Sequence, residues 1–282
     1  IMRAEARDLV FDGERMTGVR AATPDGPMEI HAQLVVGADG RHSTVRQRAE
    51  LEVLDLGAPT DVLWMRLPRR PGDANLPLGR IDAGRILVMI ARGDYFQCGY
   101  VVAKGEYQTI RAAGLEALRR SIAVLVPQMA DRVAALADWD DVKLLTVSVD
   151  RLKRWSRPGL LCIGDAAHAM SPVGGVGINL AIQDAVAAAN ILAAPLAQRR
   201  VTLGDLEAIQ RRRERPTRLT QAIQIFIQKR VIGPTLAGAD TPKAPWPVRL
   251  LNRFPILRRI PARVVGLGLR FERVATPDVH RV

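Results

Sequence analysis

Short apolar stretches, separated by turn signals, run through the first part of the chain. The turn signals Asp12-Gly13 and Pro24-Asp25-Gly26 divide the first residues into alternating runs, which predict strands joined by turns. Residues 33–40 differ, because an unbroken apolar run stops at a Gly-Ala-Asp-Gly turn. Such a run is typical of a parallel strand whose two faces are both covered. A second strand of this kind is predicted at residues 160–163, which end at Gly164-Asp165.

The middle of the chain combines strand and helix patterns. Three apolar segments between residues 61 and 103 predict strands, and the segments between them, rich in Pro, Gly and Asp, predict turns. Residues 114–136 repeat apolar positions at helical spacing, and Pro127 marks a break between two helices. Residues 143–149 return to a strand pattern.

The C-terminal part of the chain has helical patterns. A glycine-rich loop leads into an Ala-rich helix from about Gly177 to Leu192, which we expect Pro195 to close. Residues 203–232 predict a long basic helix. Prolines divide the remainder into short turns and helices.

The composition is that of a globular protein, with a strongly uneven charge. The chain has 282 residues, of which 48% are hydrophobic, so it can bury the core of one large domain or two smaller ones. The net charge of +12 comes from residues 199–282. Arg alternates there with apolar residues and Pro, without any nucleic-acid motif, so we expect no nucleic-acid binding. We favour docking against the protein, with weak membrane-surface contact as the alternative.

Cysteine usage and the absence of a leader pattern suggest a cytoplasmic protein. Cys98 and Cys162 lie in apolar surroundings without Cys-x-x-Cys spacing, which predicts neither a metal site nor a disulfide framework. No run of about 18 apolar residues occurs, and the first residues lack a signal-peptide pattern.

The segment from residue 160 to residue 192 predicts a strand, a glycine-containing loop and a helix. This geometry binds anionic or dipolar groups at a helix N-terminus. Asp165 would stand at the carboxyl end of the strand, where ligands of open α/β sheets bind, and can accept hydrogen bonds from sugar-like hydroxyls. The alternative is a tight strand-to-helix turn in which Asp165 caps the next segment.

The same segment contains Gly164-Asp165-Ala166-Ala167-His168-Ala169-Met170-Ser171-Pro172-Val173-Gly174-Gly175-Val176-Gly177-Ile178-Asn179, followed by Gln183-Asp184-Ala185. Together these residues resemble the second FAD-binding motif of flavoproteins of the para-hydroxybenzoate hydroxylase type. The resemblance implies that Asp165 binds the ribityl chain. It implies that Gly177, Ile178 and Asn179 present backbone amides to the N1 and C2 edge of the flavin ring, with Pro172 beside the ring. Gly164, Gly174 and Gly175 belong to the same candidate cofactor site. We expect His168 to pack or to bond to the backbone rather than to act as an acid or base.

A second motif lies at residues 36–46. Taken by itself, Asp39-Gly40 predicts a turn, Ser43 a helix cap and Arg46 a solvated side chain. The segment also resembles the Asp-Gly motif of the same family, which implies that Asp39, Gly40 and Arg46 take part in FAD and nicotinamide-nucleotide binding.

The two motifs in this order, separated by a β-rich insert, imply an α/β fold. We expect a partial FAD-binding domain, Rossmann-like and of the glutathione-reductase type, interrupted by a β-sheet substrate domain that covers the flavin ring and followed by a C-terminal helical region. The expected segments are 1–53 and 149–198 for the FAD-binding domain, 54–148 for the substrate domain and 199–282 for the basic helical region.

The chain lacks the Gly-x-Gly-x-x-Gly unit with which proteins of this family begin. We expect that roughly the first hundred residues of a typical member are absent, judged from usual domain sizes. A fragment is the favoured explanation, and a short protein completed by a partner is the alternative. On either explanation, we expect low stability and no FAD retention by the chain alone.

The resemblance implies a flavin monooxygenase. NADH or NADPH would reduce FAD, dioxygen would add at the flavin C4a, and the hydroperoxide would oxidise a small aromatic or similar organic substrate. A reductase, dehydrogenase or halogenase on the same scaffold is one alternative, and a non-catalytic remnant is another. The motifs identify neither the substrate nor a catalytic acid or base.

Overall fold

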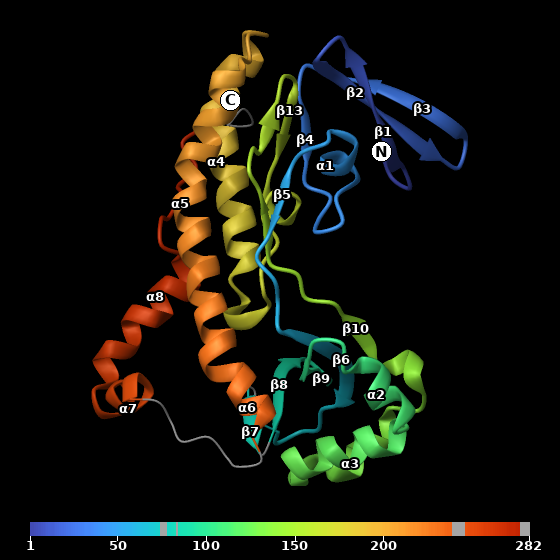
Figure 1. Ribbon diagram of the computed structural model, residues 1–282, viewed down its shortest axis with the longest axis vertical. Coiled ribbons are helices and arrows are strands. Elements are labelled where there is room, and N and C mark those ends of the chain that lie inside the picture. The colour runs from blue at the N-terminus through green and yellow to red at the C-terminus, as the bar shows by residue number, and fades with distance from the viewer. Residues whose placement is uncertain (74–77, 83, 239–245, 277–282) are drawn as a thin grey trace. The chain divides into compact units, whose positions relative to one another are not determined.

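The computed structural model describes residues 1–73, 78–82, 84–238 and 246–276, and the chain divides into two compact units (Figure 1). The first, which we call the motif unit, comprises Ile1–Gly57, Ser148–Ile223 and Pro255–Val282. The second, the insert unit, comprises Ala58–Val147 and Gln224–Phe254. The C-terminal basic region is thus shared between the two units.

An antiparallel sheet of three strands begins the motif unit and confirms the strands and turns predicted there. The strands β1 (Glu5–Asp12), β2 (Arg15–Thr23) and β3 (Gly26–His31) are adjacent in chain order. Gly13 and Gly26 occupy the turns with φ of 57° and 115°, values that glycine adopts without a Cβ clash. Leu9 and Met16 are buried, so this sheet contributes to the core.

The two predicted apolar strands do pair in parallel. β4 (Val35–Gly37) lies beside β13 (Leu160–Cys162), and β12 (Ser156–Arg157) pairs antiparallel with β13. Gly37 lies opposite Cys162, where an added Cβ would come within 2.9 Å of Val45 Cγ1 and 3.0 Å of Cys162 Sγ, so close packing requires glycine. Val36 is 45% exposed. The described residues therefore cover β4 on one face only, where the sequence predicted two.

Two long helices complete the motif unit. α4 (Gly177–Ala197) begins where predicted, but it does not end at Pro195. Pro195 lies in the last turn, where its missing N–H removes a single hydrogen bond, and Gln198 N still donates to the Ala194 carbonyl at 3.1 Å. α5 (Leu203–Ile227) confirms the predicted basic helix. The smaller elements are α1 (Thr44–Arg48), α8 (Arg259–Leu267) and the antiparallel pair β5 (Val53–Asp55) and β11 (Asp150–Leu152).

The segment Val173–Ala197, which contains α4, is long and apolar enough by length and composition to cross a membrane. However, Asp184 on this helix is fully buried in ion pairs with His168 and Arg213. Ala188 and Leu192 pack in the core of the motif unit, next to Trp155 and the strand β13. We therefore interpret α4 as a core helix of this unit.

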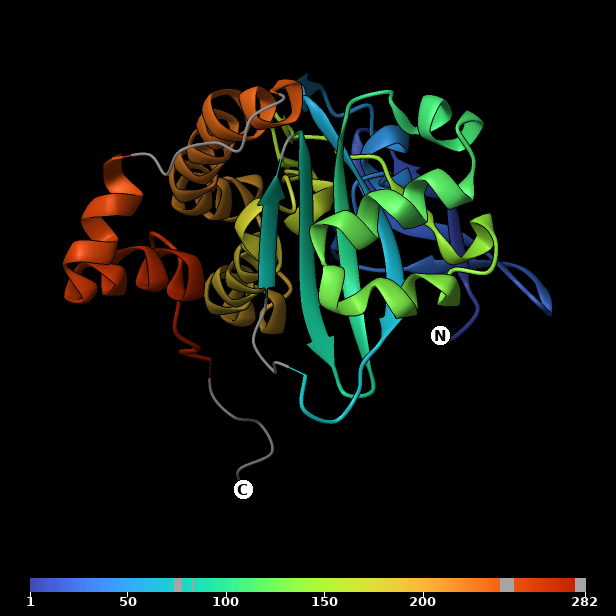
Figure 2. The same cartoon turned by 90° about the horizontal axis from the view of Figure 1, so that it is seen from below.

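A five-stranded antiparallel sheet forms the insert unit, in the order β10-β6-β9-β8-β7 (Figure 2). The strands are β6 (Thr60–Pro68), β7 (Leu78–Asp82), β8 (Arg85–Arg92), β9 (Tyr95–Ala103) and β10 (Lys143–Leu145). Alternate side chains of β6, such as Leu63, Met65 and Leu67, are buried against α3 (Leu115–Leu125) and the 3₁₀ segment η1 (Pro127–Ala135). The predicted break at Pro127 is confirmed.

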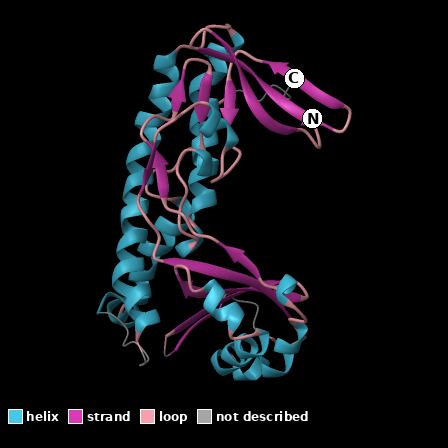
Figure 3. Cartoon of the chain, turned by 45° about the vertical axis from the view of Figure 1, so that its right-hand side comes forward, coloured by secondary structure: helices cyan, strands magenta, loops and turns pink. Residues whose placement is uncertain are grey.

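The insert unit also differs from the prediction in places. The strand predicted at residues 143–149 ends at Leu145, because Val147 N donates to Asp61 Oδ1 at 2.9 Å instead of to a neighbouring strand. The strand β7 was not predicted. The helices α2 (Tyr107–Ala112), α6 (Gly233–Ala237) and α7 (Trp246–Arg253) complete the unit, and a π-helical turn, Gln228–Ile232, lies between α5 and α6. Figure 3 shows the helices of the chain in cyan and its strands in magenta.

Candidate functional site

The two sequence motifs meet at one edge of the parallel pair of strands. Ile163 N donates to the Gly37 carbonyl at 2.9 Å, which continues the ladder between β4 and β13 to their carboxyl ends. Asp39 follows β4 and Asp165 follows β13, so both carboxylates lie at the edge where ligands of α/β sheets bind.

The Asp39 motif forms a helix start. Asp39 Oδ2 accepts a hydrogen bond from Val45 N at 3.1 Å, and Ser43 Oγ accepts one from Arg46 N at 2.9 Å, so both side chains cap α1. Gly40 has a φ of 84°, and an added Cβ would meet nothing within 4 Å. The capping predicted from local sequence is therefore present, and the loop still leaves open space at Gly40.

Arg46 is buried rather than solvated. Its Nη1 lies 3.1 Å from Asp150 Oδ1, and its Nη2 donates to the Arg41 carbonyl at 2.5 Å. The ion pair joins α1 to β11, whereas the local pattern predicted an exposed side chain. A role of Arg46 toward a cofactor remains a prediction, and these contacts identify Asp150 as the residue that orients it.

The loop after β13 holds Asp165 in an open position. Gly164 has a φ of 58°, and an added Cβ would come within 3.0 Å of Ala181 Cβ, so the loop approaches α4 closely. Its N–H donates to Asp184 Oδ2 at 3.1 Å. Asp165 is partly exposed, and within the described ranges no residue pairs with its carboxylate. Asp165 thus does not act as the cap that the alternative interpretation required.

The glycine turn leads into a helix start without a side-chain cap. Pro172 precedes the short 3₁₀ segment Val173–Gly175, in which Gly174 and Gly175 have φ of 79° and 63°. An added Cβ at Gly175 would meet open space. In the part of the chain that the structure describes, no side chain caps α4. The N–H groups of Gly177, Ile178 and Asn179 have no partners inside the helix, because they belong to its first turn.

These features fit FAD on chemical grounds. A carboxylate without a partner accepts hydrogen bonds from ribityl hydroxyls, and an uncapped helix N-terminus stabilises negative charge at the N1 and C2 edge of a flavin. The positive φ values require glycine and leave the backbone accessible. The structure brings Asp165, Gly174, Gly175 and the start of α4 into one continuous segment, with Asp39 at the same sheet edge.

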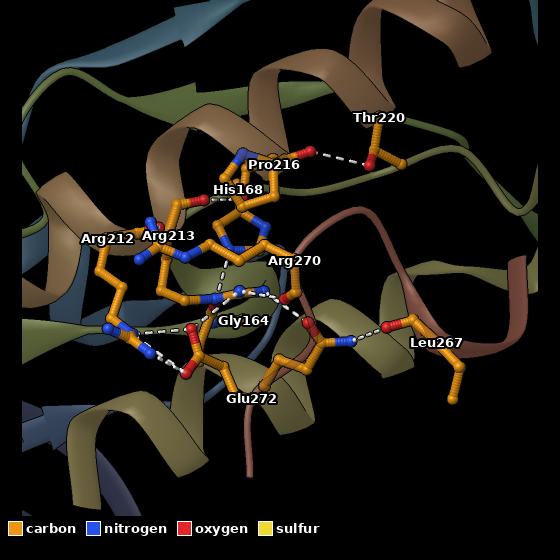
Figure 4. Close-up of polar contacts among 12 residues, drawn as sticks. Gly164, His168, Arg212, Arg213, Pro216, Thr220, Leu267, Arg270 and Glu272 are labelled. Atoms are coloured by element: carbon orange, nitrogen blue, oxygen red, sulfur yellow. Dashed lines mark hydrogen bonds and ion pairs between the residues drawn. The ribbon is translucent and has the colours of Figure 1, made fainter. Parts of the chain in front are cut away.

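A buried polar network lies behind this segment (Figure 4). His168 Nε2 lies 2.5 Å from Asp184 Oδ2, and Arg213 Nε donates to Asp184 Oδ1 at 2.9 Å. Burial acts to raise the pKa of Asp184, but its interactions with His168 and Arg213 outweigh that effect and lower this pKa. His168 also packs on Trp155, with ring centroids 4.9 Å apart. It therefore packs as expected, but its side chain bonds to a carboxylate instead of the backbone.

Asp184, which belongs to the second motif, was given no role in the sequence analysis, and Arg213 and Glu272 were not singled out there. An aspartate inside an Ala-rich, apolar helix is the signal that could have identified Asp184 as a buried, paired group. Both cysteines are buried, and burial raises the pKa of each thiol to about 12, so neither is a reactive group. Among the described residues there is no cluster of metal-binding side chains.

The sequence model of the family described as "FAD binding domain" matches residues 2–222, so the chain belongs to this family. The chain is 35% identical over 264 residues to 6-methylpretetramide 4-monooxygenase of Streptomyces rimosus. The match covers 91% of this chain and 61% of that enzyme. The chain thus spans about three fifths of the length of this relative. FAD is the cofactor of the family, as the motifs implied.

Solved structures confirm the fold class. The probable FAD-dependent monooxygenase PqsL of Pseudomonas aeruginosa superposes with a TM-score of 0.67 at 24% identity, over 83% of this chain and 65% of its own. The flavin-dependent brominase Bmp2 gives a TM-score of 0.69 at 15% identity, over 95% and 65% of the two chains. At these identities the likeness concerns the fold alone.

Proposed function

We propose that the whole protein is a FAD-dependent monooxygenase, which uses NADH or NADPH and dioxygen to hydroxylate a small aromatic or similar organic substrate. The observation that carries this proposal is the open segment from Asp165 to the uncapped start of α4. The similarity to a relative named as a monooxygenase supports the reaction type.

When bound, FAD would supply the redox chemistry between the nicotinamide cofactor and dioxygen. Asp165 would accept hydrogen bonds from the ribityl hydroxyls. The N–H groups of Gly177, Ile178 and Asn179 would donate to the ring edge and stabilise negative charge there. Pro172 would lie beside the ring.

Asp39, Gly40 and Arg46 form the second part of the proposed cofactor site. Asp39 caps α1 with one carboxylate oxygen, and Arg46 is held by Asp150, so the loop is rigid before a ligand arrives. A rigid loop loses little conformational entropy on binding, which favours affinity. We propose that this loop binds the dinucleotide part of FAD or the nicotinamide nucleotide.

The test uses the full-length protein that contains this chain. NADH and NADPH are added in turn with 6-methylpretetramide, the compound in the relative's name, and with simple phenols. Dioxygen consumption and a product that carries one atom from labelled dioxygen are the expected results. A protein that holds FAD but consumes no dioxygen with any of these compounds would overturn the proposal.

A halogenase is the second candidate, because the brominase Bmp2 shares the fold. The same assay with bromide or chloride separates the two reactions. A halogenated product, formed only in the presence of halide, would replace the monooxygenase assignment.

For the basic C-terminal region, we propose docking on the motif unit as the main role and weak membrane contact as a secondary one. Docking is supported by hydrogen bonds from α4 and α5 to residues 265–275. Membrane contact is supported by exposed apolar residues, among them Ile256 and Ile260, next to exposed Arg259 and Arg263. A cytoplasmic location is part of this proposal.

A further inference from the structure

The last described residues of the chain, 264–276, run beside α4, and we call them the C-terminal strap. Amide side chains of α4 hold the strap by its main chain. The bonds are Asn179 Nδ2 to Val265 O at 2.8 Å, Gln183 Nε2 to Leu267 O at 2.9 Å, Asn190 Nδ2 to Arg273 O at 2.8 Å and Ala275 N to Asn190 Oδ1 at 2.8 Å. Spacings of four and seven residues put these three amides on one face of the helix.

One carboxylate anchors the strap to α5. Glu272 is 5% exposed, and it accepts hydrogen bonds from Arg212 Nε and Nη2 at 2.8 and 2.7 Å. Its Oε1 lies 3.5 Å from Nη1 of Arg213, which also donates to the Arg270 carbonyl at 3.0 Å. The strap is therefore tied by its side chain as well as by its main chain. Glu272 is its only acidic residue.

Arg213 connects the strap to the loop that carries Asp165 (Figure 4). Its Nε donates to Oδ1 of Asp184, and Oδ2 of Asp184 accepts from Gly164 N at 3.1 Å. Gly164 directly precedes Asp165. Two ion pairs and a hydrogen bond thus connect Glu272 through Arg213 and Asp184 to the backbone N–H of Gly164, in the loop that carries Asp165.

The strap reaches the other half of the site as well. Asn179, whose backbone N–H is proposed to face the flavin ring, bonds through its side chain to Val265. A strap that leaves α4 would free Nδ2 of Asn179 and Nε2 of Gln183, and would leave Arg213 without Glu272. Without Glu272, the buried guanidinium of Arg213 would shift against its remaining carboxylate, Asp184. That shift would move Asp184 together with the N–H group of Gly164, from which Asp184 accepts a hydrogen bond.

We propose that Glu272 is a positioning residue for the FAD site, and that FAD binding and strap docking are thermodynamically coupled. The proposal rests on the proposed FAD site but not on the oxidation reaction. Coupling is reciprocal, so the factor by which the docked strap strengthens FAD binding equals the factor by which FAD strengthens strap docking. If the strap only stabilised the fold, FAD binding and strap docking would have no effect on each other.

The first experiment uses the unaltered full-length protein, with FAD bound and after FAD has been removed. Hydrogen exchange of peptides from residues 264–276 is compared between the two states. The strap is expected to exchange more slowly with FAD, by about 5- to 150-fold, the usual range of coupling between sites. Strap exchange that is the same in both states, in a protein that binds FAD, would overturn the proposal.

The second experiment compares Glu272→Gln with the matched control Glu207→Gln. Glu207 also pairs with an arginine of α5, but its pair with Arg211 is exposed. FAD dissociation constants and urea unfolding without FAD are measured for both variants. Glu272→Gln is expected to raise the dissociation constant about 5- to 150-fold and Glu207→Gln to leave it unchanged.

The two experiments distinguish the possible failures. A Glu272→Gln protein that unfolds more easily but binds FAD normally would show a lock without coupling, and would overturn the proposal. A full-length protein that binds no FAD would overturn the FAD site itself, and this proposal with it. Hydroxylation that fails while FAD and strap remain coupled would count against the reaction alone.

Discussion

Asp184 joins three buried groups of the motif unit. It accepts from Gly164 N and Arg213 Nε and pairs with His168, so both carboxylate oxygens are used. Its pKa is lowered in the folded protein, although burial alone would raise it. Asp184 therefore contributes stability at pH values above its unfolded pKa, and this contribution is lost as the pH falls through the folded value.

Asp165 contributes to binding rather than to folding, because within the described ranges its carboxylate has no partner. We predict that Asp165→Asn in the full-length protein raises the FAD dissociation constant. The loss of a charge-assisted hydrogen bond is worth about 1.5–3 kcal/mol, or roughly ten- to hundredfold in affinity. A flavin fluorescence titration measures it.

The control for this prediction is Asp12→Asn, at the exposed end of β1. It should leave FAD affinity unchanged. Unchanged affinity in Asp165→Asn as well would contradict the role of Asp165.

The places of Asp165 after a strand and of Asn179 at the start of a helix could be predicted, because strand, loop and helix follow one another within one short segment. Their roles toward FAD remain predictions. The partner of Asp184 could not be predicted in the same way. Arg213 is one of several arginines in a basic stretch, and nothing in the local pattern distinguishes it from its exposed neighbour Arg211. The pairing of Arg213 with Glu272 depends on how the end of the chain returns to α5, which local sequence does not encode.

At the scale of elements, two glycines at the start of α4 are expected to differ in their effect on protein stability. Gly175 has a φ of 63°, so Gly175→Ala is strained even though its Cβ would meet open space. Gly177 lies at the helix start, and an added Cβ would make an ordinary contact of 3.8 Å with Met170 Cβ. We predict that Gly175→Ala destabilises the protein by about 1–2 kcal/mol, while Gly177→Ala does not.

We expect both variants to bind FAD more weakly, because each adds a Cβ where the cofactor approaches the backbone. Thermal unfolding without FAD and an FAD titration measure the two effects separately. A Gly177→Ala protein with normal affinity would count against the proposed position of the ring edge.

In the insert unit, a loop is held by a buried arginine. Arg132 in η1 donates to both carboxylate oxygens of Asp73, and these hydrogen bonds lower the pKa of Asp73 to about 2. Because the folded pKa lies below the unfolded one, the pair stabilises the fold above about pH 4, and this contribution is lost as the pH falls toward 2. We predict that Asp73→Asn flattens the dependence of unfolding free energy on pH in this window.

Urea unfolding at a series of pH values between 2 and 5 measures this dependence, with Asp94→Asn in an exposed turn as the control. An unaltered pH dependence in Asp73→Asn would show that the ion pair contributes nothing to folding.

The elements that sequence patterns predicted well are those with strong local signals. The strands β6, β8 and β9 lie in three apolar segments, and the turns between β1, β2 and β3 carry glycine. β7 was missed because its short segment contains Gly79 and charged residues, and only its pairing with β8 makes it a strand. The end of α4 was misjudged because a proline in the last helical turn costs little.

On the scale of the whole molecule, the positive charge is concentrated in residues 199–282, but part of it is neutralised internally. Arg212 and Arg213 pair with Glu272, and Arg213 also with Asp184. The arginines from 258 to 263 are exposed among exposed apolar residues. This combination favours an anionic lipid surface over a nucleic acid, which offers no apolar phase.

We predict that the full-length protein binds duplex DNA weakly and binds anionic vesicles more strongly than neutral ones. Both are measured side by side at about 150 mM salt, near physiological ionic strength. Removal of residues 243–282 and repetition at lower salt provide the controls, because phosphate contacts produce a steep salt dependence. Submicromolar DNA binding that disappears with these residues would contradict the prediction.

The way in which α4 holds the C-terminal strap has a consequence for sequence variation. Asn179, Gln183 and Asn190 bond to main-chain atoms, and every residue other than proline presents the same main-chain groups. The residue types at positions 265, 267 and 273 are therefore expected to vary among related proteins. Position 272 is not free, because its carboxylate is specifically paired. Many substitutions should thus be tolerated along the strap, except at Glu272 and at Gly268. Gly268 has a φ of 78°, which favours glycine, and an added Cβ would come within 2.9 Å of Gln183 Nε2.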